Sequence, residues 1–171
     1  LVSVMGGKWT TCRPMAHDTL AAVERLLGRS LAPARSLPLL GAAGDHATTV
    51  NALEQQRIQL SSLLPDTPLR DQQISHLQGN FGLQALPLVR EADPKEPEPL
   101  SSVIPICGAE IEHAISREHA GNATDVLARR CRLAMVDLKE AQRLQSLVET
   151  RLDQAGVLSG STSPINHQLN P

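Results

Sequence analysis

The sequence has almost no aromatic residues, since its 171 residues contain one Trp, one Phe and no Tyr. Any core must therefore be built from Leu, Ala, Val and Ile, which favours packed helices over a β-sandwich. Hydrophobic residues make up 41% of the chain, which is enough for a folded core and argues against wholesale disorder. The length suits one ordinary domain with a possible appendage.

Several functional classes are disfavoured by what the sequence lacks. No apolar run approaches the roughly 20 residues of a membrane-spanning helix, and no basic-then-apolar leader is present. The net charge of −2 gives no electrostatic reason to expect a nucleic-acid partner. Cys12, Cys107 and Cys131 lie far apart, and the six histidines are dispersed. We therefore expect no disulfide framework, no metal site, three ordinary thiols and a reducing compartment.

Helical periodicity dominates the rest of the chain and predicts an all-α fold. A short strand over residues 1–5 is the exception. We predict helices over residues 15–27, 49–64, 66–79, 81–89, 109–118, 125–136 and 138–155. Prolines and glycines between residues 30 and 48 indicate a loop and the best domain boundary. Prolines interleaved with charges over residues 93–99 predict an exposed, stiff linker.

The opening segment carries the strongest chemical signal. A short apolar stretch leads into Gly6-Gly7-Lys8-Trp9-Thr10-Thr11-Cys12-Arg13, and a helix follows. A phosphate loop for nucleoside triphosphates requires another glycine before this pair and Ser or Thr directly after the Lys. Val2 and Trp9 occupy those places, so we reject that interpretation.

Two hypotheses remain for this segment. Glycines allow close approach of the backbone to a ligand, and a helix N-terminus attracts negative charge, so an anionic or electron-rich ligand is one hypothesis. Lys8 and Arg13 would add positive charge to such a site. The other is a tight turn whose Lys8 and Arg13 are simply solvated, and spacing alone slightly favours it.

The sequence resembles a known family in four blocks of consistent order and spacing, over roughly residues 1–155. The first block reads Gly-Gly-Lys-Trp-Thr-Thr-Cys-Arg-Pro-Met-Ala-His-Asp-Thr over residues 6–19. The second is Leu-Pro-Leu-Leu-Gly at 37–41, and the third combines His76-Leu77 with Phe81-Gly82 and Ala85. The fourth runs from Ala109-Glu110 to residues 132–134. All four are similar to FAD-dependent glycerol-3-phosphate dehydrogenases, the mitochondrial type in particular.

This resemblance implies the domain organisation. Residues 1–28 correspond to the last strand and helix of an FAD-binding α/β domain, and 29–158 to the helical C-terminal domain. Residues 159–171 are expected to form a flexible tail. The missing dinucleotide fingerprint would lie upstream, so we expect the chain to be the C-terminal portion of a longer protein.

The resemblance also implies the site. Gly7, Trp9, Thr10 and Thr11 are the positions expected to contact FAD, and Lys8 and, more weakly, Arg13 those expected to bind the substrate phosphate. The parent reaction would transfer a hydride from C2 of glycerol 3-phosphate to flavin N5, giving dihydroxyacetone phosphate, with electrons passed to quinone. No catalytic residue is identifiable in this chain, and the chain alone is expected to be inactive.

The chain departs from the family at four positions where Tyr is usual. Cys12, Phe81, Ile106 and His113 occupy them, which removes hydroxyl hydrogen bonds and aromatic packing. None of these changes touches Lys8.

Three arginines, Arg129, Arg130 and Arg132, form a basic cluster with two interpretations. They could meet anionic lipid or another domain's acidic surface. We favour ion pairs, because Asp125 lies four residues before Arg129 on a predicted helix.

Partners and location follow from the resemblance. We expect glycerol 3-phosphate and quinone through the parent enzyme, contact with an upstream FAD-binding domain, a possible homodimer and possible peripheral membrane association. The expected location is the mitochondrial inner membrane or a bacterial cytoplasmic membrane. A glycerol-3-phosphate oxidase of the same superfamily and a non-catalytic helical interaction module remain the alternatives.

Overall fold

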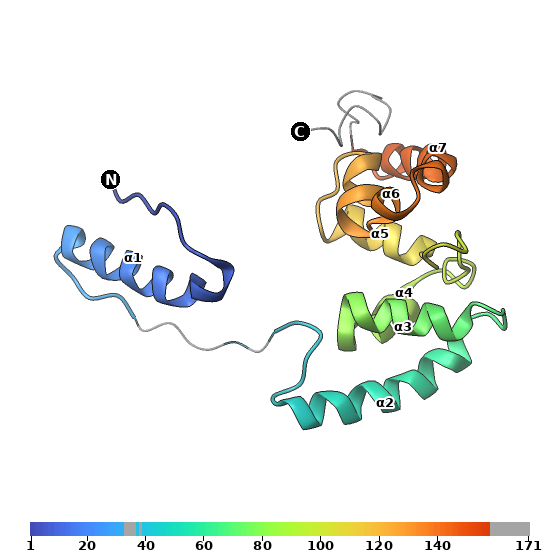
Figure 1. The fold of residues 1–171 in the computed structure, drawn as a ribbon, viewed down its shortest axis with the longest axis horizontal. Helices are drawn as coiled ribbons and strands as arrows, with labels where there is room; N and C mark the ends of the chain where they lie inside the picture. Colours follow the sequence, from blue (N-terminus) through green and yellow to red (C-terminus); the bar gives the residue numbers. More distant parts are fainter. Residues whose placement is uncertain (33–36, 38, 158–171) are drawn as a thin grey trace. The chain divides into compact units, whose positions relative to one another are not determined.

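A computed structural model describes residues 1–32, 37 and 39–157, so the predicted tail at 159–171 lies outside the described residues. The chain divides into two compact units, Leu1–Leu37 and Pro38–Pro171 (Figure 1). All regular structure over the described residues is helical, apart from one isolated bridge between Pro99 and Cys107. The prediction of an all-α fold is confirmed.

The described residues of the first unit form one turn and one long helix. The 3₁₀ turn η1 (Trp9–Thr11) runs directly into α1 (Cys12–Leu27), which begins three residues earlier than predicted. Gly28 ends α1 as predicted, because its φ of 63° is the left-handed conformation that glycine adopts without strain. No residue of α1 is buried. The predicted strand over residues 1–5 is wrong, since a strand needs a pairing neighbour and the described residues supply none.

The second unit begins with a layer of three helices and a short turn. These are α2 (His46–Leu63), α3 (Arg70–Phe81), η2 (Gly82–Gln84) and α4 (Ala85–Glu91). Their buried faces share an aliphatic cluster of Leu60, Leu64, Ile74, Leu77, Ala85 and Val89. Helix α2 starts three residues before the predicted position, because Asp45 caps it by accepting from the Thr48 amide at 2.9 Å. Hydrogen bonds from Thr48 hold the pKa of Asp45 below its usual value.

Helix α3 extends two residues beyond Gly79, where the sequence predicted its end. Gly82 ends it instead, with φ 55° and ψ −130°. The backbone of Gly41 lies directly against this turn, and the Leu83 amide donates to the Gly41 carbonyl at 2.8 Å. A Cβ on Gly82 would lie 2.2 Å from the Gly41 oxygen, so two glycines permit this close approach.

A second group of helices completes this unit. It comprises α5 (Gly108–Ser116), the π-helical segment η3 (Asp125–Arg130), α6 (Leu133–Val136) and α7 (Leu138–Gln154). They surround a larger core that includes Ile106, Ile111, Leu127, Leu133, Leu144, Val148 and Leu152. Within this unit, Figure 1 shows α5, α6 and α7 stacked beside the layer of α2, α3 and α4.

One helix predicted over residues 125–136 is instead two segments. Residue Arg132 adopts a left-handed conformation with φ 60° and separates η3 from α6. The wide π turn before it is closed by the Cys131 amide donating to the Val126 carbonyl at 3.0 Å. Both Leu127 and Leu133 are completely buried in the same core, and this common burial offsets the cost of the break.

The predicted exposed linker at residues 93–99 is also wrong in part. Pro97 is buried, and its carbonyl accepts a hydrogen bond from Gln73 of α3 at 2.6 Å. Glu96 pairs with Arg151 of α7 at 2.8 Å. The segment therefore connects the two helical groups by hydrogen bonds and an ion pair, and so helps to position them.

Candidate functional site

The predicted site residues lie on a glycine turn that leads into α1. Gly6 and Gly7 have φ angles of 77° and 102°, which L-residues with a side chain rarely adopt. Lys8 returns the chain to an extended conformation, with φ −128° and ψ 154°, immediately before η1. Both glycines are exposed, so the backbone is accessible just ahead of the helical segment.

The Thr11 side chain stabilises this turn. Its hydroxyl donates to the Lys8 carbonyl at 2.9 Å and accepts from the Lys8 amide at 3.2 Å. Thr is a common N-cap residue, and Thr10 and Thr11 precede the helix, but Thr11, which occupies the N-cap position of α1, makes no side-chain cap bond there. The hydroxyl closes the preceding turn instead.

An open groove of about 350 Å³ runs along this segment. Of the predicted residues, Gly7, Lys8 and Trp9 line it, whereas Thr10, Thr11 and Arg13 do not. The Trp9 side chain is 91% exposed, and Lys8 is also exposed. The groove has no acidic residue among its lining side chains, which are those of Val4, Lys8, Trp9, Cys12, Met15, Ala16 and Thr19, besides the two glycines.

The donor groups of these residues are compatible with a cofactor rich in hydrogen-bond acceptors, such as FAD. A Cβ on Gly7 would lie 2.1 Å from the Met15 sulfur, whereas one on Gly6 would meet nothing within 4 Å. The glycine turn is therefore packed on one side and open on the other. The Lys8 ammonium and the Trp9 indole N–H line the groove and are hydrogen-bond donors. Such donors suit an acceptor-rich ring edge or a phosphate.

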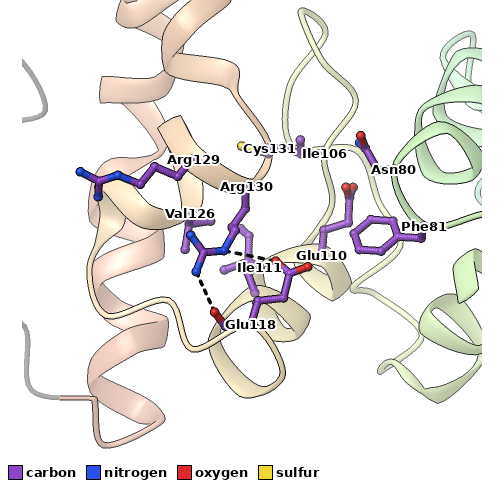
Figure 2. A pocket seen from close by; sticks show the side chains of 11 residues that line it. Asn80, Phe81, Ile106, Glu110, Ile111, Glu118, Val126, Arg129, Arg130 and Cys131 are labelled. Carbon is purple, nitrogen blue, oxygen red and sulfur yellow. Dashed lines mark hydrogen bonds and ion pairs between the residues drawn. The ribbon is translucent and has the colours of Figure 1, made fainter. Parts of the chain in front are cut away.

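The second unit holds a cavity that the sequence did not predict. It lies between the end of α3 and the helices α5 and η3 (Figure 2). Glu110 of α5 lines it and accepts a hydrogen bond from His76 Nε2 of α3 at 2.7 Å. Both residues fall within the blocks that carry the family resemblance, but nothing in their spacing indicated that they meet.

The arginine cluster is engaged in ion pairs, as the favoured interpretation proposed. Arg129 pairs with Asp125, and Arg130 pairs with Glu118 at 3.5 Å. Burial of Asp125 acts to raise its pKa, but hydrogen bonds from the Gly121 amide and from Arg129 outweigh it, so the pKa is lowered. Arg132 is also exposed, and in the described part of the chain it is the one arginine of the three that forms no ion pair.

The thiols have different surroundings. Cys12 is exposed, whereas Cys107 is buried and Cys131 is partly buried. Burial raises the pKa of Cys107 to about 12 and that of Cys131 to about 11, so both are protonated at neutral pH. Across the residues that the structure describes, no group of three His, Cys, Asp or Glu side chains could hold a metal ion. None of the described helices has the length and apolar character needed to cross a bilayer.

Comparison with known proteins identifies the family. The profile described as "C-terminal domain of alpha-glycerophosphate oxidase" matches residues 32–154. The chain belongs to this family. It is 31% identical over 161 residues to a mitochondrial glycerol-3-phosphate dehydrogenase of Arabidopsis thaliana, covering 87% of this chain and 25% of the relative. It is 30% identical over 157 residues to the Homo sapiens and Bos taurus mitochondrial glycerol-3-phosphate dehydrogenases, covering 87% of this chain and 20% of each relative. No solved structure gives a significant match.

The chain therefore spans a fifth to a quarter of the length of these glycerol-3-phosphate dehydrogenases. The family match confirms the sequence-based identification of a helical C-terminal domain. Three of the four positions where the family resemblance led us to expect Tyr lie close together. Phe81 and Ile106 line the cavity of the second unit, and the Phe81 ring meets the His113 ring edge-on at 5.4 Å.

Proposed function

We propose that this chain forms the C-terminal part of an FAD-dependent glycerol-3-phosphate dehydrogenase. The parent enzyme would oxidise sn-glycerol 3-phosphate to dihydroxyacetone phosphate and pass the electrons to quinone. One observation carries the proposal: the similarity to mitochondrial glycerol-3-phosphate dehydrogenases extends over 87% of the chain, which is more than the residues 32–154 that match the family profile.

The opening segment would form one edge of the flavin site. Gly7, Trp9, Thr10 and Thr11 would hold FAD, with the Thr11 hydroxyl already used in the turn, so that its contact would come through other atoms. Lys8 would bind the substrate phosphate, and Arg13 would add to the positive field. Bound FAD supplies the acceptor for the hydride that leaves C2 of the substrate. The residues of this chain bind and orient, and none of them is assigned a proton transfer.

The first unit supports contact with an FAD-binding domain. Its helix α1 buries no residue, and Leu20, Leu26 and Leu27 are exposed on it. Apolar side chains on an isolated helix gain stability only when another surface covers them. We propose that the dinucleotide-binding domain of the parent covers this face. The parent would associate peripherally, as a homodimer, with the mitochondrial inner membrane or a bacterial cytoplasmic membrane.

A chimera tests the function. The aligned segment of the human relative is replaced by this chain, and FAD content and glycerol-3-phosphate-dependent reduction of a quinone analogue are measured. We expect the chimera to retain FAD and activity, and the 171-residue chain alone to have neither. Failure of a folded chimera to bind FAD or to turn over would contradict the proposal, as would stoichiometric flavin in the isolated chain.

Lys8 provides the sharper measurement within the chimera. Lys8→Ala removes a charge-assisted hydrogen bond, so KM for glycerol 3-phosphate should rise roughly 10- to 100-fold, with FAD content unchanged. Arg29→Ala is the matched control, because Arg29 is an exposed cation just beyond α1. An unchanged KM in Lys8→Ala, or an equal rise in both variants, would refute the assignment of Lys8 to the phosphate.

An oxidase is the second candidate, because the matching family profile is itself described by an alpha-glycerophosphate oxidase. Such an enzyme would pass the electrons to oxygen and not to quinone. Hydrogen peroxide production by the chimera, measured beside reduction of the quinone analogue, distinguishes the two acceptors.

A further inference from the structure

Helix α6 and the start of α7 leave an apolar surface uncovered. In α6, Leu133 and Ala134 are buried in the core, whereas Met135 and Val136 are 69% and 65% exposed. Leu138, the first residue of α7, is also exposed. Single exposed apolar side chains are common on protein surfaces, but three within four residues form a patch of the kind that meets another surface.

The backbone holds these side chains on an ordered turn. Arg132 has a left-handed conformation, with φ 60°, and directs the chain from η3 into α6. The Met135 amide donates to the Arg132 carbonyl at 3.0 Å, and the Asp137 amide donates to the Leu133 carbonyl at 2.8 Å. Because these bonds already fix the main chain, covering the apolar side chains requires little further ordering of the backbone.

Two unpaired cations flank the apolar side chains. Arg132 precedes them and Lys139 follows them, and both are exposed without an ion pair to any residue that the structure describes. Between them, Asp137 caps α7 by accepting from the Glu140 amide at 3.0 Å, where the positive end of the helix dipole offsets part of its charge. Glu140 itself pairs with Arg143 at 2.8 Å. The turn therefore presents net positive charge around an apolar centre.

An apolar centre with cations on both sides is complementary to an anionic lipid surface. Lys and Arg side chains attract anionic headgroups, and apolar side chains enter the boundary between headgroups and acyl chains. A stable protein interface buries roughly 800 Å² on each partner, which three side chains do not supply. We propose that residues 132–139 dock the protein on an anionic membrane, with Met135 and Val136 inserted and the two cations at headgroup level. The inference rests on the peripheral membrane association proposed for the parent, and it names the surface of this chain that makes the contact.

Cosedimentation of the full 171-residue chain with lipid vesicles tests the proposal. Vesicles of phosphatidylcholine alone are compared with vesicles that also contain phosphatidylglycerol. We expect binding that requires phosphatidylglycerol and that is lost at about 1 M salt, where charges are screened within about 3 Å. Since the whole chain has a formal net charge of −2, attraction to anionic lipid has to come from a local surface. Equal sedimentation with both kinds of vesicle, or none with either, overturns the proposal.

Substitution of the cations assigns the binding to this surface. Arg132→Gln combined with Lys139→Gln should weaken binding about 25-fold, because each cation near an anionic membrane contributes roughly a factor of five. Arg25→Gln combined with Arg29→Gln is the matched control. These two exposed cations also form no ion pair among the described residues, and their loss changes the net charge equally. Equal weakening by both pairs of substitutions overturns the assignment.

Substitution of the apolar side chains tests insertion. Met135→Ser combined with Val136→Ser should weaken binding about tenfold, since less apolar surface then leaves water. Ile58→Ser combined with Leu63→Ser is the matched control, because both residues are exposed on α2, Ile58 to 66%. Binding that is unchanged without Met135 and Val136, or that the α2 substitutions weaken equally, overturns the proposal. Circular dichroism establishes that each variant is folded, and if one variant is not, the lipid and salt comparison on the unaltered chain decides.

The chimera with the human relative separates this inference from the proposed function and from another occupant of the surface. Vesicle binding by the 171-residue chain needs neither FAD nor turnover, so each proposal can fail while the other holds. In the chimera, Met135→Ser combined with Val136→Ser should leave the FAD content unchanged. Loss of FAD from this folded variant would show that another domain of the parent covers the surface, and would overturn docking on a membrane.

Discussion

The contact between Gly41 and Gly82 allows the effect of one methyl group to be worked out. In Gly82→Ala, the new Cβ would lie 2.2 Å from the Gly41 carbonyl oxygen and 3.0 Å from its carbon. Both atoms belong to the backbone, so no side-chain rotation relieves the clash. The φ of 55° with ψ −130° is also a conformation that only glycine adopts readily.

Two contributions set the expected loss of stability. Forcing alanine into this region costs about 1–3 kcal/mol, and the Leu83–Gly41 backbone bond, worth about 1 kcal/mol, is broken if the segments separate. The free energy of unfolding should therefore fall by about 2–4 kcal/mol. At about 3 °C per kcal/mol for a chain of this size, Tm should fall by roughly 6–12 °C.

Gly79→Ala is the control, since Gly79 lies inside α3 and a Cβ there would meet nothing within 4 Å. Alanine is the better helix former, so this variant should be more stable by about 0.5–1 kcal/mol. Urea and thermal unfolding followed by far-ultraviolet circular dichroism measure both variants. A loss below about 1 kcal/mol in Gly82→Ala, or equal effects of both substitutions, would refute the reasoning.

Two further predictions concern ionisable groups. Hydrogen bonds from Arg143 lower the pKa of Glu140 to about 2 from an ordinary value of 4.5. Since the folded-state pKa is lowered, the stabilisation is present above pH 4.5 and disappears as pH falls towards 2. Glu140→Gln should therefore be less stable by about 0.5–1 kcal/mol at pH 7 and no less stable near pH 2, and urea unfolding at both pH values measures this. In thiol titration at neutral pH, Cys12 should react at once, because it is exposed, and Cys107 and Cys131 only on unfolding. Rapid labelling of Cys107 and Cys131 in the folded chain would contradict the burial that raises their pKa values.

Most helices could be predicted because their signals are local. Helix α7 is the clearest case. Its sequence predicts one apolar stripe of Leu138, Ala141, Leu144, Val148 and Leu152, and all of these except Leu138 at the first turn are buried. The break at Arg132 could not be predicted, since arginine is a good helix former and nothing local opposes a continuous helix. The break occurs because it allows both Leu127 and Leu133 to be buried in the same core.

The candidate site likewise has one feature that the sequence predicts and one that it does not. The glycine turn at Gly6 and Gly7 was predictable, because consecutive glycines before a helix indicate positive φ angles and close approach. The pairing of His76 with Glu110 was not, because 34 residues separate them and neither has a distinctive neighbourhood in the sequence.

By itself, the sequence determined the helical class, the glycine turn and the family, because each depends on residue types at short spacing or on blocks in a conserved order. Only the tertiary structure shows that Glu96 binds Arg151, which lies 55 residues away in the sequence, and that Glu110 of α5 pairs with His76 of α3 beside a cavity. Such contacts depend on how helices pack, and packing brings together residues whose separation along the chain carries no signal.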